Sequence, residues 1–157
     1  MHKNDQSRNV ALVPQSIHEI ERFTDDVCDN LYINDTYYGN ILMSLTTMFE
    51  LCLTTSEEKS VNISYNTDYQ VVTIVFKPLP SQLSSLFSEK IVLSDDELST
   101  KAFLIKNLTD KVELSDQSIS LQFDIRAMHN KVYRERMDKL QSYLSQHELK
   151  KVKRKND

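Results

Sequence analysis

Glycine is almost absent from this sequence: Gly39, in the string YYGN, is the single one among 157 residues. Loops that wrap phosphate groups need glycine, because their backbone takes positive φ angles and approaches the ligand where a Cβ would stand in the way. The sequence therefore lacks every glycine-rich nucleotide-binding loop, including the Walker and dinucleotide-binding types.

Long hydrophobic runs are also lacking. Every apolar run is short and broken by polar residues, and the first nine residues, MHKNDQSRN, lack the hydrophobic stretch of a secretory signal. We therefore expect no membrane span and a cytoplasmic protein.

Residues that commonly bind metals or form disulfides are few. Cys28 and Cys52 have no C-x-x-C partner and fall among apolar helix positions, which is typical of reduced core thiols. A disulfide between them stays open at this point, because only a distance decides it. We expect no metal site, because no zinc-ligand spacing connects either cysteine to the four histidines, His2, His18, His129 and His147.

Charge is unevenly distributed along the chain. Residues 1–126 hold 10 basic and 19 acidic side chains, whereas residues 127–157 hold 9 basic and 4 acidic ones. An acidic body disfavours nucleic acid as a partner and leaves only the basic tail for an acidic partner, nucleic acid or an anionic surface. The tail equally fits a solvated C-terminus; its basic residues are Lys150, Lys151, Lys153, Arg154 and Lys155.

The hydrophobic pattern predicts an α+β domain over residues 10–126, after a mobile N-terminus over 1–9. The first part contains an edge strand over 9–14, a helix from a capping box at Ser16–Glu19 to about Leu31, and a second helix over about 35–53. The second part contains a hairpin over 60–76 with its turn at Asn66–Asp68, a connection over 77–93 with one short helix, a helix opened by a capping box at Ser94–Glu97, and a hairpin around Asp116–Gln117. This order favours a two-layer α/β sandwich, with a mainly antiparallel sheet and helices on one face.

From residue 127 the pattern changes to one amphipathic helix followed by the basic tail. The apolar side chains of this helix step by four, three and four residues: Tyr133, Met137, Leu140 and Leu144. This spacing covers about two heptads of a coiled coil. It predicts either a homodimer seam or a helix that folds back on the domain.

Several strings resemble a known family. FTDDVCDNLYI and NDTYYGNILMSLT in the two helices, VVTIVF in the first hairpin, and AFLIKNLTDKVEL followed by SISLQF are similar to segments of histidine-kinase-like ATPase (GHKL or Bergerat) domains. The chain resembles in particular the anti-sigma factor serine kinase type, in the compact versions found in Bacteroidetes. The similarity covers about residues 10–125 and implies a Bergerat-like sandwich.

The resemblance also implies where a nucleotide site would lie. In the family, the second helix carries a catalytic glutamate and, four residues later, a magnesium-binding asparagine; Thr47 and Leu51 stand at these positions. The family's adenine-binding D-x-G-x-G corresponds to Pro78, Pro80 and Gln82, and its phosphate-binding G-x-G corresponds to the segment from Ser99 to Lys101.

None of these replacements keeps the family's chemistry. Leucine does not bind a hard cation, and a threonine hydroxyl is no general base near neutral pH. Proline has no side-chain acceptor for the adenine amino group. In addition, Asp95, Asp96 and Glu97 place carboxylates where a phosphate would need bare helix amides.

We therefore expect a family fold that has lost its nucleotide site, with no catalytic residue and no cofactor. The resemblance implies a regulatory protein partner, such as a sigma factor or its antagonist. Two alternatives stay open: an active serine kinase that binds ATP and magnesium through atypical motifs, with Glu50 as the nearby acid, and a scaffold that binds nucleic acid through the basic tail.

Overall fold

The computed structural model describes residues 6–31, 33, 35–68, 70–88 and 96–125. The predicted C-terminal helix with Tyr133, Met137, Leu140 and Leu144 lies outside the described residues, and so do the basic tail and two members of the predicted capping box, Ser94 and Asp95. Among the described helices, none has the length and apolar character that crossing a membrane requires.

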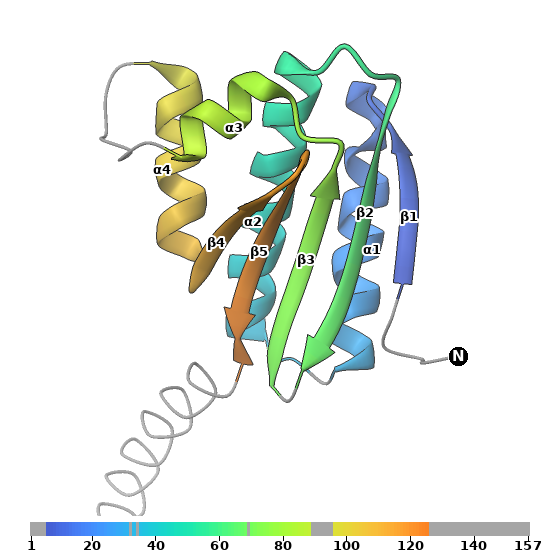
Figure 1. The fold of residues 1–157 in the computed structure, drawn as a ribbon. Coiled ribbons are helices and arrows are strands. Elements are labelled where there is room, and N and C mark those ends of the chain that lie inside the picture. The colour runs from blue at the N-terminus through green and yellow to red at the C-terminus, as the bar shows by residue number, and fades with distance from the viewer. Residues whose placement is uncertain (1–5, 32, 34, 69, 89–95, 126–157) are drawn as a thin grey trace, which may run out of the picture. The chain divides into compact units, whose positions relative to one another are not determined.

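Five antiparallel strands form one sheet in the order β1-β2-β3-β5-β4 (Figure 1). Each strand pairs antiparallel with its neighbours, so β1 and β4 are the edges. The strands are β1 (Gln6–Ala11), β2 (Ser60–Asp68), β3 (Val71–Lys77), β4 (Lys111–Ser115) and β5 (Ser118–Asp124).

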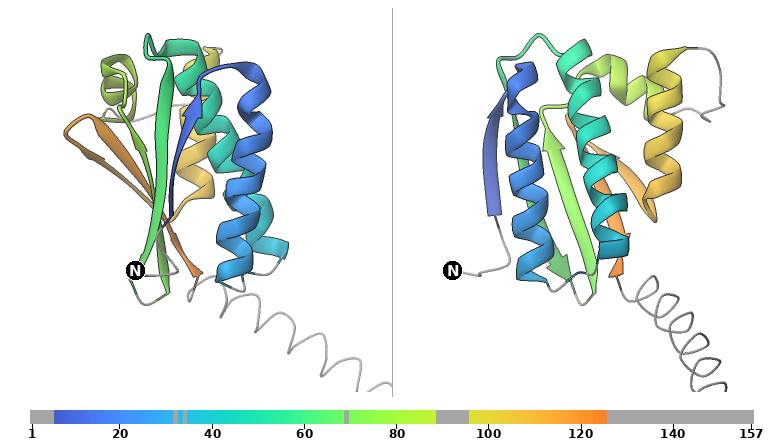
Figure 2. Two further views of the ribbon diagram at one scale, coloured as in Figure 1. Left: turned by 90° about the vertical axis from the view of Figure 1, so that its right-hand side faces the viewer. Right: turned by 180° about the vertical axis from the view of Figure 1, so that it is seen from behind.

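Three helices cover one face of this sheet (Figure 2). They are α1 (Ile17–Asn30), α2 (Asp35–Thr55) and α4 (Glu97–Leu108), and α2 packs against both of the others. The short α3 (Ser81–Ser88) follows β3 and contacts α2, α4 and β4. Helices on one face of an antiparallel sheet are the α+β arrangement that the sequence predicted.

The core lies between the helices and the sheet, because the strands alternate buried and half-buried residues as a sheet covered on one face must. The buried strand residues point toward the helices: Val61, Ile63, Tyr65, Val72, Ile74, Phe76, Ile119, Leu121 and Phe123. The other face is half-buried and mainly polar in its centre, with Asn62, Ser64, Thr73, Ser120 and Gln122.

The start of the chain corrects one prediction. The first strand begins at Gln6, so residues 6–9 belong to an edge strand and not to a mobile N-terminus. Two side-chain contacts that local sequence does not reveal hold this strand: the Ser7 hydroxyl lies 3.2 Å from the Asn62 side-chain oxygen, and Arg8 forms an ion pair with Asp26 at 3.1 Å. Long-range pairing thus orders residues whose composition alone is that of a mobile segment.

The capping box predicted at Ser16–Glu19 is wrong. Ser16 has helical backbone angles and makes no side-chain cap hydrogen bond, because a 3-10 turn over Pro14–Ser16 precedes α1. The proline provides the φ angle that starts a helical turn. The chain therefore enters α1 through this turn, and the serine oxygen is not used as a cap.

The turn of the first hairpin is also displaced from its predicted place. Asn66, Thr67 and Asp68 pair with Thr73, Val72 and Val71 of β3 across the sheet, so they belong to the strand and not to the turn. These polar residues were expected to leave the strand because asparagine and aspartate favour turns. Register with the buried residues of β3 determines the outcome instead.

The helix α4 begins at Glu97, later than the capping box at Ser94–Glu97 predicts. Its N-cap is Asp96, whose carboxylate accepts hydrogen bonds from the backbone amide of Ser99 at 3.0 Å and from the Ser99 hydroxyl at 2.9 Å. A charged acceptor at the positive end of a helix stabilises it more than a serine hydroxyl does.

Replacing Asp96 with alanine should therefore lower the free energy of unfolding by about 0.5–2 kcal/mol, because the Ser99 amide loses its acceptor. Asp96→Asn keeps an oxygen acceptor and is the matched control, with a loss less than half as large. Urea denaturation followed by circular dichroism measures both variants. Equal losses would contradict the assigned cap.

Candidate functional site

The two positions of α2 that the resemblance assigns to catalysis and magnesium are part of the core. Leu51 is fully buried and Thr47 is 5% exposed. This burial follows from the position of α2 between α1 and α4 on the sheet, which leaves little of its surface to solvent. Neither side chain therefore reaches a surface where a nucleotide or a metal ion could bind.

The third family segment lies on α4 and is engaged in contacts within the protein. Lys101 is 23% exposed, and its Nζ lies 3.8 Å from the Glu50 carboxylate on α2 and 3.3 Å from the Glu97 carboxylate. The amide of Ser99 is taken by the Asp96 carboxylate. The acid that an atypical kinase would use, Glu50, is thus part of an ion pair that links two helices.

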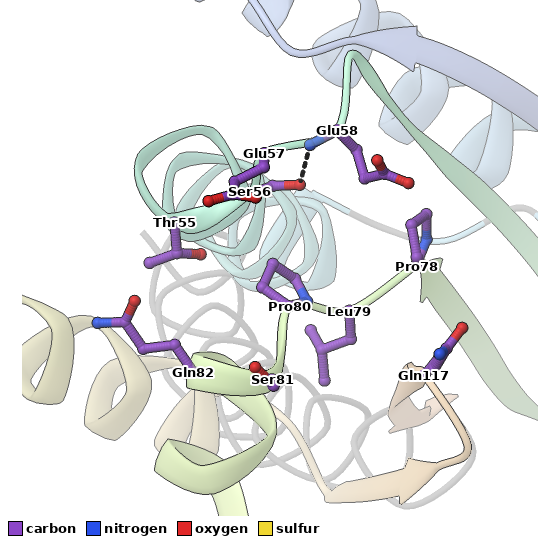
Figure 3. A pocket seen from close by; sticks show the side chains of 10 residues that line it. All are labelled: Thr55, Ser56, Glu57, Glu58, Pro78, Leu79, Pro80, Ser81, Gln82 and Gln117. Carbon is purple, nitrogen blue, oxygen red and sulfur yellow. Dashed lines mark hydrogen bonds between the residues drawn. The ribbon is translucent and has the colours of Figure 1, made fainter.

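The second family segment lines a pocket of about 490 Å³ (Figure 3). The pocket lies where the end of α2, the connection from β3 to α3 and the turn between β4 and β5 meet. Its lining residues are Thr55, Ser56, Glu57, Glu58, Pro78, Leu79, Pro80, Ser81, Gln82 and Gln117. Of the predicted site residues, the structure brings Pro78, Pro80 and Gln82 together here.

Backbone hydrogen bonds hold the floor of the pocket. The amide of Leu79 donates to the carbonyl of Gln117 at 2.7 Å, which ties the connection to the turn. The carbonyl of Pro80 accepts from the amides of Leu83 and Ser84 and so begins α3. Gln117 has a φ of 60°, a left-handed conformation that side-chain-bearing residues seldom adopt. In this conformation the carbonyl of Gln117 accepts the hydrogen bond from the amide of Leu79.

The pocket is electrostatically negative. Glu57 and Glu58 contribute two carboxylates, and among the described residues no lysine, arginine or histidine lines the pocket. The C-terminal end of α2 adds the negative end of its helix dipole, and its last turn holds no basic residue. The hydroxyl of Ser56 accepts a hydrogen bond from the amide of Glu58 at 3.0 Å and fixes the backbone that carries the two glutamates.

Sequence reasoning missed this part of the pocket. Glu57 and Glu58 lie a few residues after the predicted end of the second helix, and acidic residues after a helix C-terminus oppose its dipole. That anomaly was visible in the sequence. The contribution of Gln117 was not, because only the fold brings the turn of the second hairpin to the connection that follows β3.

The cysteines and the described histidine offer no reactive group near the pocket. Cys28 and Cys52 are both free and buried, which answers the question of a disulfide. Burial raises the pKa of each thiol to about 12, and nearby Asp25 and Asp29 add to this for Cys28. His18 lies on the surface of α1, 3.2 Å from Glu21. Among the described residues no group of three or more metal-binding side chains occurs.

The raised pKa of the Cys52 thiol predicts a loss of stability in alkali. The unfolded thiol ionises near pH 9 and the folded one near pH 12, so stability that is present below pH 9 is lost as the pH rises toward 12. At a pH of about 10.5 the loss is about 2 kcal/mol. Cys52→Val cannot ionise, and urea denaturation at pH 8 and in alkali should show a shallower decline for this variant. Parallel declines would contradict the prediction.

No protein-family model matches the chain, and no curated protein matches it in sequence. The resemblance therefore depends on the strings quoted above, and a functional proposal depends on the chemistry of these residues.

Proposed function

We propose that this chain is a non-catalytic regulatory module that binds another protein, built on a Bergerat-like fold of the anti-sigma kinase type without an ATP and magnesium site. The proposal rests on the surroundings of the three segments that correspond to the nucleotide-binding motifs of the family. One is in the core, one is capped by a carboxylate, and one lines a pocket with two glutamates.

Electrostatics supports the loss of nucleotide binding. A nucleoside triphosphate is strongly anionic and needs amides or cations at its phosphates. The N-terminal amide of Ser99 on α4 is occupied by Asp96 at 3.0 Å. In the pocket, a phosphate would meet the carboxylates of Glu57 and Glu58. Like charges at such a site repel the ligand.

Packing supports the loss of magnesium binding. Magnesium requires oxygen ligands in octahedral geometry. Leu51, at the family's magnesium position, has no such atom and is fully buried. Glu50, at the preceding position of α2, forms an ion pair with Lys101 at 3.8 Å. An active kinase would have to break this ion pair and bring a base to the site from elsewhere.

The kind of partner follows from the resemblance: a regulatory protein such as a sigma factor or an antagonist of one. In the described residues β1 and β4 are the two edges of the sheet, and an edge strand can pair with a strand of another chain. A protein partner also suits the acidic body, which repels nucleic acid. We propose a cytoplasmic role because every apolar run of the sequence is short and broken by polar residues.

Calorimetric titration of the full chain with ATP and magnesium, beside a thermal melt, tests the proposal. We expect no heat of binding and no shift in Tm at millimolar nucleotide, because a ligand that does not bind the native state cannot stabilise it. Saturable ATP binding that Glu50→Gln abolishes would overturn the proposal and favour the kinase. The same calorimetry with purified sigma factors and their antagonists from the same organism tests for the protein partner.

A further inference from the structure

We propose that the pocket defined above, called here the Glu57–Glu58 pocket, binds the guanidinium group of an arginine side chain in a basic segment of a protein partner. The inference rests on the proposed function, since it specifies the chemistry by which such a module recognises its partner. It is carried by four features of the pocket: its size, its charge, its hydrogen-bond acceptors and its apolar floor.

The pocket is large enough to admit an arginine side chain. Its volume of about 490 Å³ falls within the range of small-ligand sites. Figure 3 shows Glu57 directed toward Thr55 and Glu58 directed toward Pro78, on either side of the Pro80 ring. The two carboxylates thus lie toward different sides of the pocket.

The negative charges of the two glutamates destabilise the C-terminal end of α2, because they lie at the negative end of its dipole. This 21-residue helix has no basic residue in its last turn and is followed by two glutamates, the reverse of what its dipole favours. Neither glutamate forms an ion pair with another residue in the part of the chain that the structure describes. A cationic ligand removes this repulsion, and binding is then coupled to the stability of the helix end.

The polar lining offers acceptors to a group that only donates. The Thr55 hydroxyl already donates to the carbonyl of Leu51 at 2.7 Å, so its oxygen is left as an acceptor. The side-chain amides of Gln82 and Gln117 bring further oxygens, besides those of the two carboxylates. Guanidinium carries five donors and no acceptor, in a planar arrangement that pairs with carboxylates.

The floor of the pocket is apolar. Leu79 is nearly buried and Pro80 lies beside it. Arginine packs its methylene groups and the flat face of its guanidinium on such surfaces while its edge makes hydrogen bonds. Lysine, with a compact and strongly hydrated ammonium group, uses this floor less well. A metal ion is disfavoured, because the described residues contain no group of three metal ligands.

The test is an NMR titration of the ¹⁵N-labelled full chain with the peptide acetyl-Gly-Arg-Gly-amide. The peptide with citrulline in place of arginine has the same shape without the charge. We expect saturable shifts at residues 55–58, 79–82 and 117, at least tenfold weaker binding of the citrulline peptide, and severalfold weaker binding of a lysine peptide. Equal binding of the citrulline or the lysine peptide would overturn the assignment of a guanidinium site.

Two double variants locate the binding site. Glu57→Gln with Glu58→Gln should weaken binding of the arginine peptide at least tenfold and raise the Tm of the free protein, because the repulsion at the end of α2 is relieved. Glu19→Gln with Glu21→Gln removes the same charge from exposed positions of α1 and should leave the affinity within twofold. Equal effects of the two double variants would overturn the site, since they would indicate non-specific attraction to an acidic body.

The same titration with ATP and magnesium separates this inference from the proposed function. Nucleotide shifts at the Glu57–Glu58 pocket would overturn both proposals, because the pocket would then accept an anion. Absence of shifts with both the nucleotide and the arginine peptide would overturn the guanidinium site alone and leave the non-catalytic module standing.

Discussion

Leu51→Asn is expected to lower the free energy of unfolding by about 4 kcal/mol. The side chain is fully buried on α2, so the substitution loses the burial of most of a leucine, at about 2–5 kcal/mol. It also places an amide among apolar neighbours, where an unpaired polar group adds about 1–3 kcal/mol. Asparagine at position 51, the residue at the magnesium position of the family that the chain resembles, thus disrupts the core before it can form a metal site.

The matched control for this variant is Met43→Asn on the same helix. Met43 is 49% exposed, so the same change in helix propensity occurs without loss of a buried contact. We expect its cost to stay below about 1 kcal/mol. Urea denaturation of both variants, followed by circular dichroism, gives the comparison. A cost for Leu51→Asn as small as that for Met43→Asn would mean that residue 51 faces an open site, as in an active family member.

Phe23→Ala is expected to cost about 3–5 kcal/mol, because it removes a fully buried ring between α1 and the sheet. The ring of Phe23 meets that of Tyr65 edge-on, with centroids 5.8 Å apart and planes at 82°. Pairs in this geometry are worth about 0.5–1.5 kcal/mol beyond their burial. A double-mutant cycle with Tyr65→Ala should therefore show a coupling of that size.

Tyr65→Phe provides the control for this cycle. It keeps the ring contact with Phe23 and removes only the hydroxyl, which accepts a hydrogen bond from the Asn30 side chain at 3.1 Å. We expect a loss of about 1 kcal/mol for this single hydrogen bond. Full additivity of Phe23→Ala and Tyr65→Ala would show that burial alone, and not the edge-on contact, connects α1 to β2.

Within the described residues, the periodic patterns of the sequence predicted the types of the elements and the two layers correctly. Val61, Ile63 and Tyr65 alternate with polar residues and are all buried, and the helical stripe of Ile20 and Phe23 faces the sheet as expected. Such patterns are reliable because a strand or helix that buries one face must repeat its apolar residues at the period of the backbone.

The ends of the elements were predicted less well. The strand that begins at Gln6, the turn after Asp68 and the cap at Asp96 each differ from the predicted position. Competing local hydrogen bonds at such places differ by about 1 kcal/mol or less. Pairing with distant residues decides between them, and a single sequence does not show which distant residues meet.

The candidate site divides in the same way. The resemblance led to Pro78, Pro80 and Gln82, which do line a pocket, and to Thr47 and Leu51, which lie in the core. The loss of nucleotide binding, the regulatory role and the identity of the partner stay predictions. The two carboxylates of the pocket, which disfavour a nucleotide, come from Glu57 and Glu58, to which no motif pointed.

The sequence by itself determined the composition-driven properties of this protein: an α+β domain with an acidic body, one glycine and no glycine-rich phosphate loop. These follow from residue counts and from periods of two and 3.6 residues, which are local. Only the tertiary structure decided that the end of α2, the segment after β3 and the turn before β5 enclose one pocket. These segments are separated by some twenty to sixty residues along the chain, and the packing of helices on a sheet in one particular register brings them together.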